Sequence, residues 1–288
     1  MPAHLIVERC GPMVTVQDRG RRGQARYGVP ASGPLDREVF DAAVAAVGGA
    51  VLEAVGGGDL GAIEIPLASA RFRVEGTALV SIDGEPPQEV TDTVVEVPVH
   101  ARAVRYLAVR GGIDVPRVLG SRATLPIAGL GGFHGRPLRA GDRLAIGEAG
   151  ERAAAAEAPP RGGELAAGSE TLLTLLPAFD VDEEVLRALL AGTFAVDPRS
   201  DRVGTRLAGA ASIPAALGER LSRPIVPGTV QLPPDGRPIV IGPDGPTTGG
   251  YPVVGVLDRE SRWRLARVRP GGRVRFHVAE TRGRVNGA

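Results

Sequence analysis

Hydrophobic residues along this chain mostly alternate with polar ones in short runs, the pattern typical of β-strands. Glycine, proline and aspartate bound these runs. Such runs predict strands over residues 4–8, 71–74, 78–82, 93–97, 103–109, 172–176 and 272–279, and, between tight turns, over 225–226, 238–241 and 253–257. The pattern therefore predicts a mostly β protein, but it fits a barrel and a sandwich equally well.

Two stretches instead have the 3.6-residue period of an amphipathic helix. The first, over residues 35–47, follows Pro34 and ends at two glycines, and Asp36 in its first turn is favoured there as a capping residue. The second, over residues 181–189, begins with a capping-box-like pair of Asp180 and Glu183 and ends at Gly192. One helix is thus predicted in each half.

A sequence echo indicates that the chain has two halves. LRAGDRLAI at residues 138–146 recurs as VRPGGRVRF at 268–276, each with a glycine-centred turn before an alternating strand. Residues 147–170 between them are rich in Ala, Gly and Pro and have no sustained apolar period, as in a linker. We therefore predict two β domains, over residues 1–150 and 165–288, joined by a linker at about 147–170.

Charge and composition exclude several kinds of chemistry. The 288 residues carry a formal net charge of +1, and all the basic side chains apart from histidine are arginines, because the sequence contains no lysine. A P-loop lysine, a Schiff-base lysine and a lysine carrying biotin are therefore excluded. Balanced charge and only 3% aromatic residues argue against nucleic-acid binding. The single cysteine, Cys10, and four scattered histidines predict no metal site.

We expect a cytoplasmic protein without membrane contact. No run approaches the ~20 apolar residues that a membrane-spanning helix needs. The first residues, MPAHLIVERCG, also lack the basic start and apolar core of a signal peptide.

Candidate chemistry is densest in residues 222–256, where polar side chains lie among prolines and glycines that fix the backbone. Gln231 can both donate to and accept from an amide, and Asp235 can serve as a base. Thr247 and Thr248, with the amides of Gly249 and Gly250 and the neighbouring Tyr251, are suited to hold an oxyanion or a substrate. The alternative is a series of β-turns with a purely structural role.

A second group of candidates lies in the first half. Gln17 and Asp18 follow a strand-like run, and Arg21 stands in the glycine-punctuated loop after them. The planar guanidinium group of arginine suits a carboxylate or a polarised carbonyl, so these residues and Arg122 are candidate substrate ligands. The alternative is a turn in which Asp18 caps its own backbone. The loop histidine His134 is interpreted as structural.

Four sequence blocks resemble a known family. They are TVQDRGRRGQARYGVPASGPLD at residues 15–36, the segment 106–144, SDRVGTRL at 200–207, and PGTVQLPPDGRPIV at 227–240 followed by TTGGYP at 247–252. Together they resemble the biotin-dependent carboxyltransferase family, whose members are also called allophanate hydrolase subunit 2 or the C subunit of 5-oxoprolinase. The resemblance implies two cyclophilin-like β-barrel domains.

The resemblance also implies a function, with alternatives. The first is membership of a bacterial complex that opens the lactam of 5-oxoproline to glutamate with ATP, the ATP site lying on, or shared with, another subunit. The second is a carboxyltransferase that moves CO2 from carboxybiotin to urea or a related amide. The third is a non-catalytic regulatory protein that binds the companion subunit, as the kinase-inhibitor-antagonist members of the family are thought to do. One sequence feature supports this third alternative: LVSIDGEPP at residues 79–87 lacks the TGAD insert usual in the family.

These interpretations define the expected site and partners. We expect a companion subunit resembling allophanate hydrolase subunit 1 or the B subunit of 5-oxoprolinase, with a lactam-utilisation (A) subunit as a further candidate partner, and no activity from this chain alone. No cofactor is expected to be covalently bound, and the substrate is a small amide or lactam. The predicted catalytic residues are Gln231, Asp235 and Thr248. The predicted substrate-binding residues, expected to converge with them on one pocket, are Gln17, Asp18, Arg21, Arg122, Thr247, Gly249, Gly250 and Tyr251.

Overall fold

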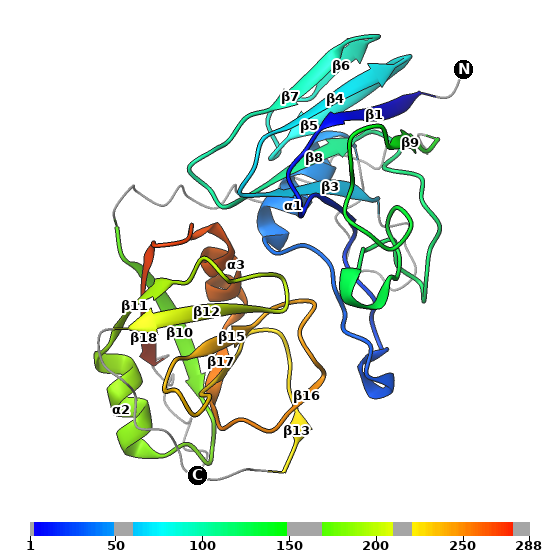
Figure 1. Ribbon diagram of the computed structural model, residues 1–288. Coiled ribbons are helices and arrows are strands. Elements are labelled where there is room, and N and C mark those ends of the chain that lie inside the picture. Colours follow the sequence, from blue (N-terminus) through cyan, green and yellow to red (C-terminus); the bar gives the residue numbers. More distant parts are fainter. Residues whose placement is uncertain (1–2, 49–59, 149–168, 210–220, 279–288) are drawn as a thin grey trace, which may run out of the picture. The chain divides into compact units, whose positions relative to one another are not determined.

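A computed structural model describes residues 3–48, 60–148, 169–209 and 221–278 (Figure 1). The chain divides into two compact units, Met1–Leu165 and Ala166–Ala288, each of which is described here by itself. Both are built mainly of strands, so the predicted mostly β, barrel-like fold is confirmed. In the described part of the chain, no helix is long and apolar enough to cross a membrane.

Two antiparallel sheets form the first unit. The four-stranded sheet has the order β7-β4-β1-β9, and the five-stranded sheet has the order β2-β3-β8-β5-β6. The strands are β1 (His4–Arg9), β2 (Thr15–Gln17), β3 (Ala62–Pro66), β4 (Ala70–Glu75), β5 (Thr77–Ile82), β6 (Gln88–Thr91), β7 (Val94–Val97), β8 (Val104–Val109) and β9 (Arg143–Ala145). Their inward side chains, including Leu5, Phe72, Ile63 and Leu107, form one hydrophobic core.

The helix α1 (Arg37–Ala46) covers the other face of the five-stranded sheet. Phe40 of the helix packs edge-on against Tyr106 of β8, with ring centroids 5.7 Å apart. As predicted, Asp36 caps the helix, and its carboxylate accepts hydrogen bonds from the backbone N–H groups of Glu38 and Val39. Because β3 and β8 are covered on both faces, their residues are almost all buried.

A closed barrel forms the second unit, with the strand order β10-β17-β14-β15-β12-β11-β18. Strands β10 and β18 run parallel, and the remaining pairs are antiparallel. The bounds are β10 (Thr171–Pro177), β11 (Thr193–Val196), β12 (Gly204–Gly209), β14 (Thr229–Gln231), β15 (Ile239–Ile241), β17 (Val253–Leu257) and β18 (Arg273–Val278). A separate ladder joins β13 (Arg223–Pro224) to β16 (Thr248–Gly249). The strand predicted at 225–226 is therefore wrong, because the strand ends at Pro224 and residues 225–226 lie outside it.

Helices of the second unit correct two predictions. The helix α2 (Glu183–Ala191) is capped by Asp182, not by Asp180, whose carboxylate instead lies 2.9 Å from the guanidinium of Arg223. A further helix, α3 (Arg259–Arg267), was not predicted, because its sequence RESRWRLAR has only two large apolar residues and no amphipathic stripe. Tertiary contact holds it: Ser261 Oγ accepts a hydrogen bond of 2.8 Å from the backbone of Thr174 in β10.

The sequence echo corresponds to a repeated turn. Gly141 and Gly271 hold the same position in the two copies and have left-handed φ values of 90° and 83°. Each turn leads directly into a strand, β9 in the first unit and β18 in the second. The repeat is therefore a structural one, because glycine is the residue that adopts this backbone conformation without a steric cost.

Candidate functional site

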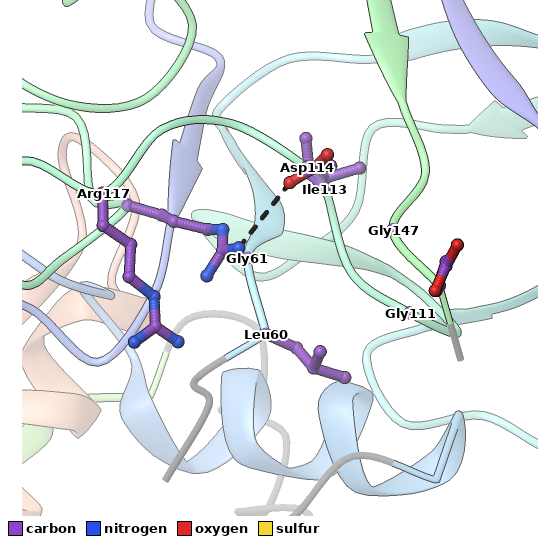
Figure 2. A pocket seen from close by; sticks show the side chains of 9 residues that line it. Leu60, Gly61, Gly111, Ile113, Asp114, Arg117 and Gly147 are labelled. Carbon is purple, nitrogen blue, oxygen red and sulfur yellow. Dashed lines mark ion pairs between the residues drawn. The ribbon is translucent and has the colours of Figure 1, made fainter. Parts of the chain in front are cut away.

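The predicted site residue Arg122 lines a hollow in the first unit. This hollow of about 250 Å³ is also lined by Asp114, Arg117 and Glu148 and by the backbone of three glycines. Nη2 of Arg122 lies 3.7 Å from Oδ1 of Asp114, and the dashed line at the labelled Asp114 in Figure 2 marks this ion pair. Two guanidinium groups and two carboxylates therefore meet here, so the charges of the hollow are nearly balanced.

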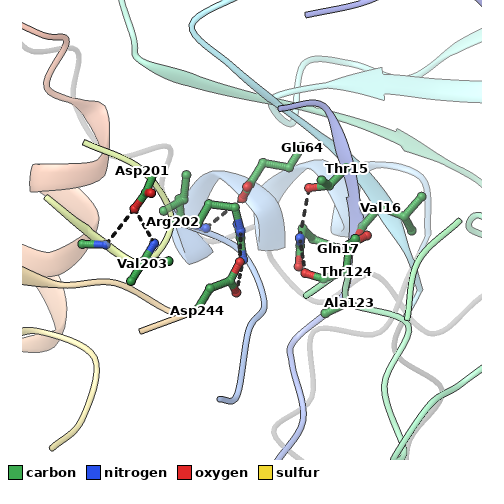
Figure 3. Close-up of polar contacts among 12 residues, drawn as sticks. Thr15, Val16, Gln17, Glu64, Ala123, Thr124, Asp201, Arg202, Val203 and Asp244 are labelled. Carbon is green, nitrogen blue, oxygen red and sulfur yellow. Dashed lines mark hydrogen bonds and ion pairs between the residues drawn. The ribbon is translucent and has the colours of Figure 1, made fainter. Parts of the chain in front are cut away.

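Three other predicted residues hold the loop that carries Arg122. Gln17, at the end of β2, donates from Nε2 to the carbonyl of Thr124 (3.2 Å) and to Thr15 Oγ1 (3.0 Å), as Figure 3 shows. The guanidinium of Arg21 donates to the carbonyl of Ala123. The structure therefore brings Gln17, Asp18, Arg21 and Arg122 together. We name the hydrogen bonds of Gln17, Asp18 and Arg21 to residues 121–124 the loop latch.

The carboxylate of Asp18 is the centre of the loop latch. It is 1% exposed and accepts three hydrogen bonds: from Gly20 N (2.9 Å), Ser121 Oγ (2.5 Å) and Arg122 N (2.5 Å). The predicted turn in which Asp18 caps its own backbone is thus present in the bond to Gly20. The other two bonds join segments 103 and 104 residues apart, which the sequence did not indicate.

Glycines allow the same loop to fold back on itself. Gly131 and Gly132 have left-handed φ values of 66° and 53°. A Cβ atom on Gly131 would collide with the carbonyl oxygen of Ala123, and one on Gly132 with the side chain of Thr124. The glycine-rich segment thus packs closely on the residues held by the loop latch, as expected for a close-packed loop.

In the second unit, three predicted residues converge. Gln231 ends β14 with 4% of its surface exposed, and its Nε2 donates to the carbonyl of Tyr251 at 3.4 Å. A Cβ atom on Gly249 would lie 2.5 Å from the same nitrogen, so Gly249 leaves the room that the Gln231 amide occupies. The Gln231 amide therefore supports the chain that carries Tyr251.

The two threonines lie in the ladder beside this group. The carbonyl of Thr247 accepts a hydrogen bond of 3.0 Å from Ile225 N, and Thr248 and Gly249 form β16, which pairs with β13. The side chain of Thr248 is exposed. The backbone from Thr247 to Gly249 thus has a structural role in strand pairing, and the exposed side chain of Thr248 is not part of that pairing.

Asp235 and Tyr251 line a pocket of about 430 Å³ in the second unit. Asp235 lies in the turn between β14 and β15, where its Oδ1 accepts a hydrogen bond of 3.1 Å from Arg237 N. Tyr251 is 48% exposed. The remaining lining residues are Asp197, Arg199, Arg206, Leu207, Pro233, Pro234, Arg237, Pro238 and Ile239; we call this set, with Asp235 and Tyr251, the arginine pocket.

The three arginines of this pocket were not predicted. They come from the turn after β11, from β12 and from the turn before β15, so no single sequence motif contains them. Arg199 forms hydrogen bonds with both carboxylate oxygens of Asp197, at 3.0 and 2.7 Å. These bonds hold the pKa of Asp197 well below its usual range. The sequence did hold a signal for two of them, because Arg206 and Arg237 lie in the blocks at 200–207 and 227–240 that carry the family resemblance.

Two buried polar pairs were also missed. Arg202 and Asp244 form a bidentate ion pair in the second unit at 2.7 and 3.0 Å, with side chains 3% and 2% exposed (Figure 3). In the first unit, Tyr106 donates to the buried Glu64 at 2.7 Å and accepts from Asp36 N at 3.0 Å. Burial, then the nearby charges of Glu64 and Asp36, raise the pKa of Tyr106 well above its usual value.

No group of three or more His, Cys, Asp or Glu side chains suited to a metal ion occurs within residues 3–48, 60–148, 169–209 and 221–278. The side chains of the candidate residues described above offer carboxylate, guanidinium, amide, hydroxyl and phenol groups.

Comparisons with known proteins cover nearly the whole chain. Residues 27–278 match the family described as "Carboxyltransferase domain, subdomain A and B". The chain is 30% identical to the C subunit of 5-oxoprolinase from Escherichia coli (strain K12), a match that covers 94% of this chain and 90% of that protein. Two solved structures each match 96% of this chain but less than two thirds of their own: TTHA0988 (31% identity, TM-score 0.77, 55% covered) and the K. lactis urea amidolyase (25%, 0.81, 18%).

Proposed function

The chain belongs to the carboxyltransferase domain family, subdomains A and B, and on this premise we propose that it is part of a 5-oxoprolinase complex. Such a complex opens the lactam of 5-oxoproline to glutamate with ATP. The observation that carries the proposal is the length of the match: the chain accounts for 90% of the C subunit of E. coli 5-oxoprolinase, but for 18% of the solved urea amidolyase. Nearly all of the former protein thus corresponds to residues of this chain.

Within this function we propose that Asp235 and Tyr251 face the substrate. Opening a lactam requires activation of its carbonyl and proton transfer at its nitrogen. An exposed carboxylate in a pocket, such as that of Asp235, is a suitable group for the proton transfer. Gln231 acts as a positioning residue through its bond to the carbonyl of Tyr251. Thr247, Thr248, Gly249 and Gly250 form the adjoining wall. In the first unit, Gln17, Asp18 and Arg21 position Arg122 through the loop latch.

ATP is proposed to bind on a companion subunit or at a surface shared with it. The chain has no lysine, so it supplies neither a P-loop lysine nor a lysine for attached biotin. We propose that the companion resembles the B subunit of 5-oxoprolinase, that a lactam-utilisation (A) subunit joins them, and that this chain alone is inactive. The complex is placed in the cytoplasm, where ATP is available.

Reconstitution tests the proposal. The chain is co-expressed with its candidate companion subunits, and glutamate and ADP are measured from 5-oxoproline and ATP, with each subunit omitted in turn. We expect turnover only from the complete complex. Asp235→Ala should reduce turnover by about 100-fold or more, the usual effect of losing a positioned base, while complex assembly is unchanged. Full turnover by this chain alone would contradict the proposal.

Carboxyl transfer is the second candidate, because the chain superimposes on the K. lactis urea amidolyase with a TM-score of 0.81 over 96% of its length. The same preparation is therefore assayed with urea and a carboxybiotin donor. Carboxylation of urea without hydrolysis of 5-oxoproline would favour this candidate. A complex that assembles but turns over neither substrate would favour a regulatory role.

A further inference from the structure

The arginine pocket lies where several strands leave the barrel of the second unit. Arg199 follows β11, Arg206 lies in β12 opposite Ile239 at the start of β15, and Asp235 and Arg237 lie in the turn between β14 and β15. A cavity of about 430 Å³ is large enough for a small organic molecule. It is therefore a candidate ligand site of the second unit by itself.

The guanidinium groups of this pocket differ in how they are used. Arg199 is held by Asp197 through two side-chain hydrogen bonds. Arg206 and Arg237 are exposed, and in the described part of the chain neither side chain has an ion-pair or hydrogen-bond partner. Two guanidinium groups in one concave site attract an anion, and their planar N–H donors match the oxygens of a carboxylate.

The net charge of the pocket limits the charge of the anion that it can bind. Three guanidinium groups and the two carboxylates of Asp197 and Asp235 leave one net positive charge among the lining residues. A singly charged carboxylate balances this charge, whereas a polyphosphate would meet two carboxylates without enough cations to compensate. The lining thus favours a small monocarboxylate over a nucleotide.

The remaining lining residues suit a compact ring with a hydrogen-bond donor. Pro233, Pro234 and Pro238 present apolar side chains on a backbone whose φ angles are fixed. Asp235 uses Oδ1 to accept from Arg237 N, and its Oδ2 has no hydrogen-bond partner among the described residues. A carboxylate oxygen in that position accepts a hydrogen bond from an amide N–H.

We propose that the arginine pocket binds a small, singly charged amide acid, with Arg206 and Arg237 on its carboxylate and Asp235 on its amide N–H. This inference rests on the proposed function, because 5-oxoproline carries both groups on one five-membered ring. The pocket then distinguishes 5-oxoproline from lactams that lack the carboxylate. Arg206 and Arg237 are accordingly specificity-determining residues.

Calorimetric titration of the purified full chain tests the pocket. The probes are L-5-oxoproline, 2-pyrrolidinone (the same lactam without the carboxylate), inorganic phosphate and ATP. We expect 5-oxoproline to bind and 2-pyrrolidinone to bind at least about 10-fold more weakly, since a charged hydrogen bond is lost. Arg206→Gln and Arg237→Gln should each weaken 5-oxoproline binding by about 10- to 100-fold. Arg187→Gln, which removes the same charge from the exposed face of α2, is the matched control and should bind as wild type.

The outcomes separate this proposal from the proposed function. Equal binding of 5-oxoproline by wild type, Arg206→Gln and Arg237→Gln would overturn the pocket, as would tighter, arginine-dependent binding of phosphate or ATP. If the reconstituted complex turns over 5-oxoproline and both variants keep the wild-type KM, the function stands and the pocket is refuted. Arginine-dependent binding of 5-oxoproline without turnover in the complete complex would support the pocket and contradict the function.

Discussion

Replacing Asp18 with asparagine should loosen the loop latch. The Asp18 carboxylate is 1% exposed and accepts from Gly20 N, Ser121 Oγ and Arg122 N. Asparagine keeps the shape but turns one oxygen into an N–H₂ donor. If the N–H₂ group replaces Oδ1, it can donate to the Ser121 hydroxyl, but Gly20 N loses its acceptor. If it replaces Oδ2, Arg122 N loses its acceptor. In either orientation one backbone N–H is left without an acceptor.

The expected cost follows from that lost bond. A hydrogen bond to a charged group contributes about 1.5–3 kcal/mol, and a buried donor left without an acceptor costs a similar amount. We expect the free energy of opening the latch to fall by about 2–3 kcal/mol. At about 1.4 kcal/mol per tenfold change, amide exchange at Gly20 and Arg122 should accelerate by about 30- to 150-fold.

Hydrogen–deuterium exchange read by NMR measures this effect at the two amides themselves. The control is Asp114→Asn in the same unit, whose side chain is 61% exposed and contacts Arg122 only through the ion pair at 3.7 Å. Because exposed pairs contribute little, it should change exchange by less than about threefold. Unchanged protection of Gly20 and Arg122 in Asp18→Asn would refute the loop latch as the element that holds this loop.

Three further predictions concern stability. The carboxylate of Asp142 accepts two hydrogen bonds of 2.8 Å from Arg136, and these bonds lower the pKa of Asp142 below its usual value of 3.8. The ionised carboxylate therefore stabilises the folded protein fully above pH 3.8, and this stabilisation is lost as the pH falls through the lowered pKa of the folded protein. Asp142→Asn should therefore cost about 1–2 kcal/mol in denaturant unfolding at neutral pH and less at about pH 3; an equal cost at both would contradict the ion pair. Tyr106→Phe removes a fully buried hydroxyl that joins the carboxylate of Glu64 to Asp36 N at the start of α1. Thermal unfolding should show a loss of about 1–3 kcal/mol in the free energy of unfolding, and an unchanged stability would show that these two hydrogen bonds contribute nothing. Gly131 and Gly129 have left-handed φ values of 66° and 61°, but a Cβ atom would meet the backbone only at Gly131. Gly129→Ala should therefore reduce the free energy of unfolding by about 1–2 kcal/mol, and Gly131→Ala should reduce it clearly more. Equal Tm values for the two variants would refute this close packing.

Local patterns determined the elements that depend on local physics. Alternating strands such as β4 and β10, the capped helix α1, and the repeated turn at Gly141 and Gly271 were all predicted, because strand period, capping and left-handed backbone are properties of a few adjacent residues. The short strand β3 was not predicted, because its alternation extends over only three residues, Ile63-Glu64-Ile65; in the structure Glu64 is buried as well as the two isoleucines. The polar helix α3 was missed because tertiary contacts, and not an apolar stripe, hold it.

The same distinction applies to the candidate site. Sequence alone identified Gln17, Asp18, Arg21 and Arg122 as polar residues in loops, and it offered a turn as the alternative to ligand binding. Tertiary structure decided that three of them hold the loop of the fourth across about 100 residues. Sequence likewise placed Asp235 and Tyr251 near one another, but the arginines beside them come from three separate elements. A pocket depends on which strands pair, and pairing between distant segments leaves no signal in the spacing of neighbouring residues.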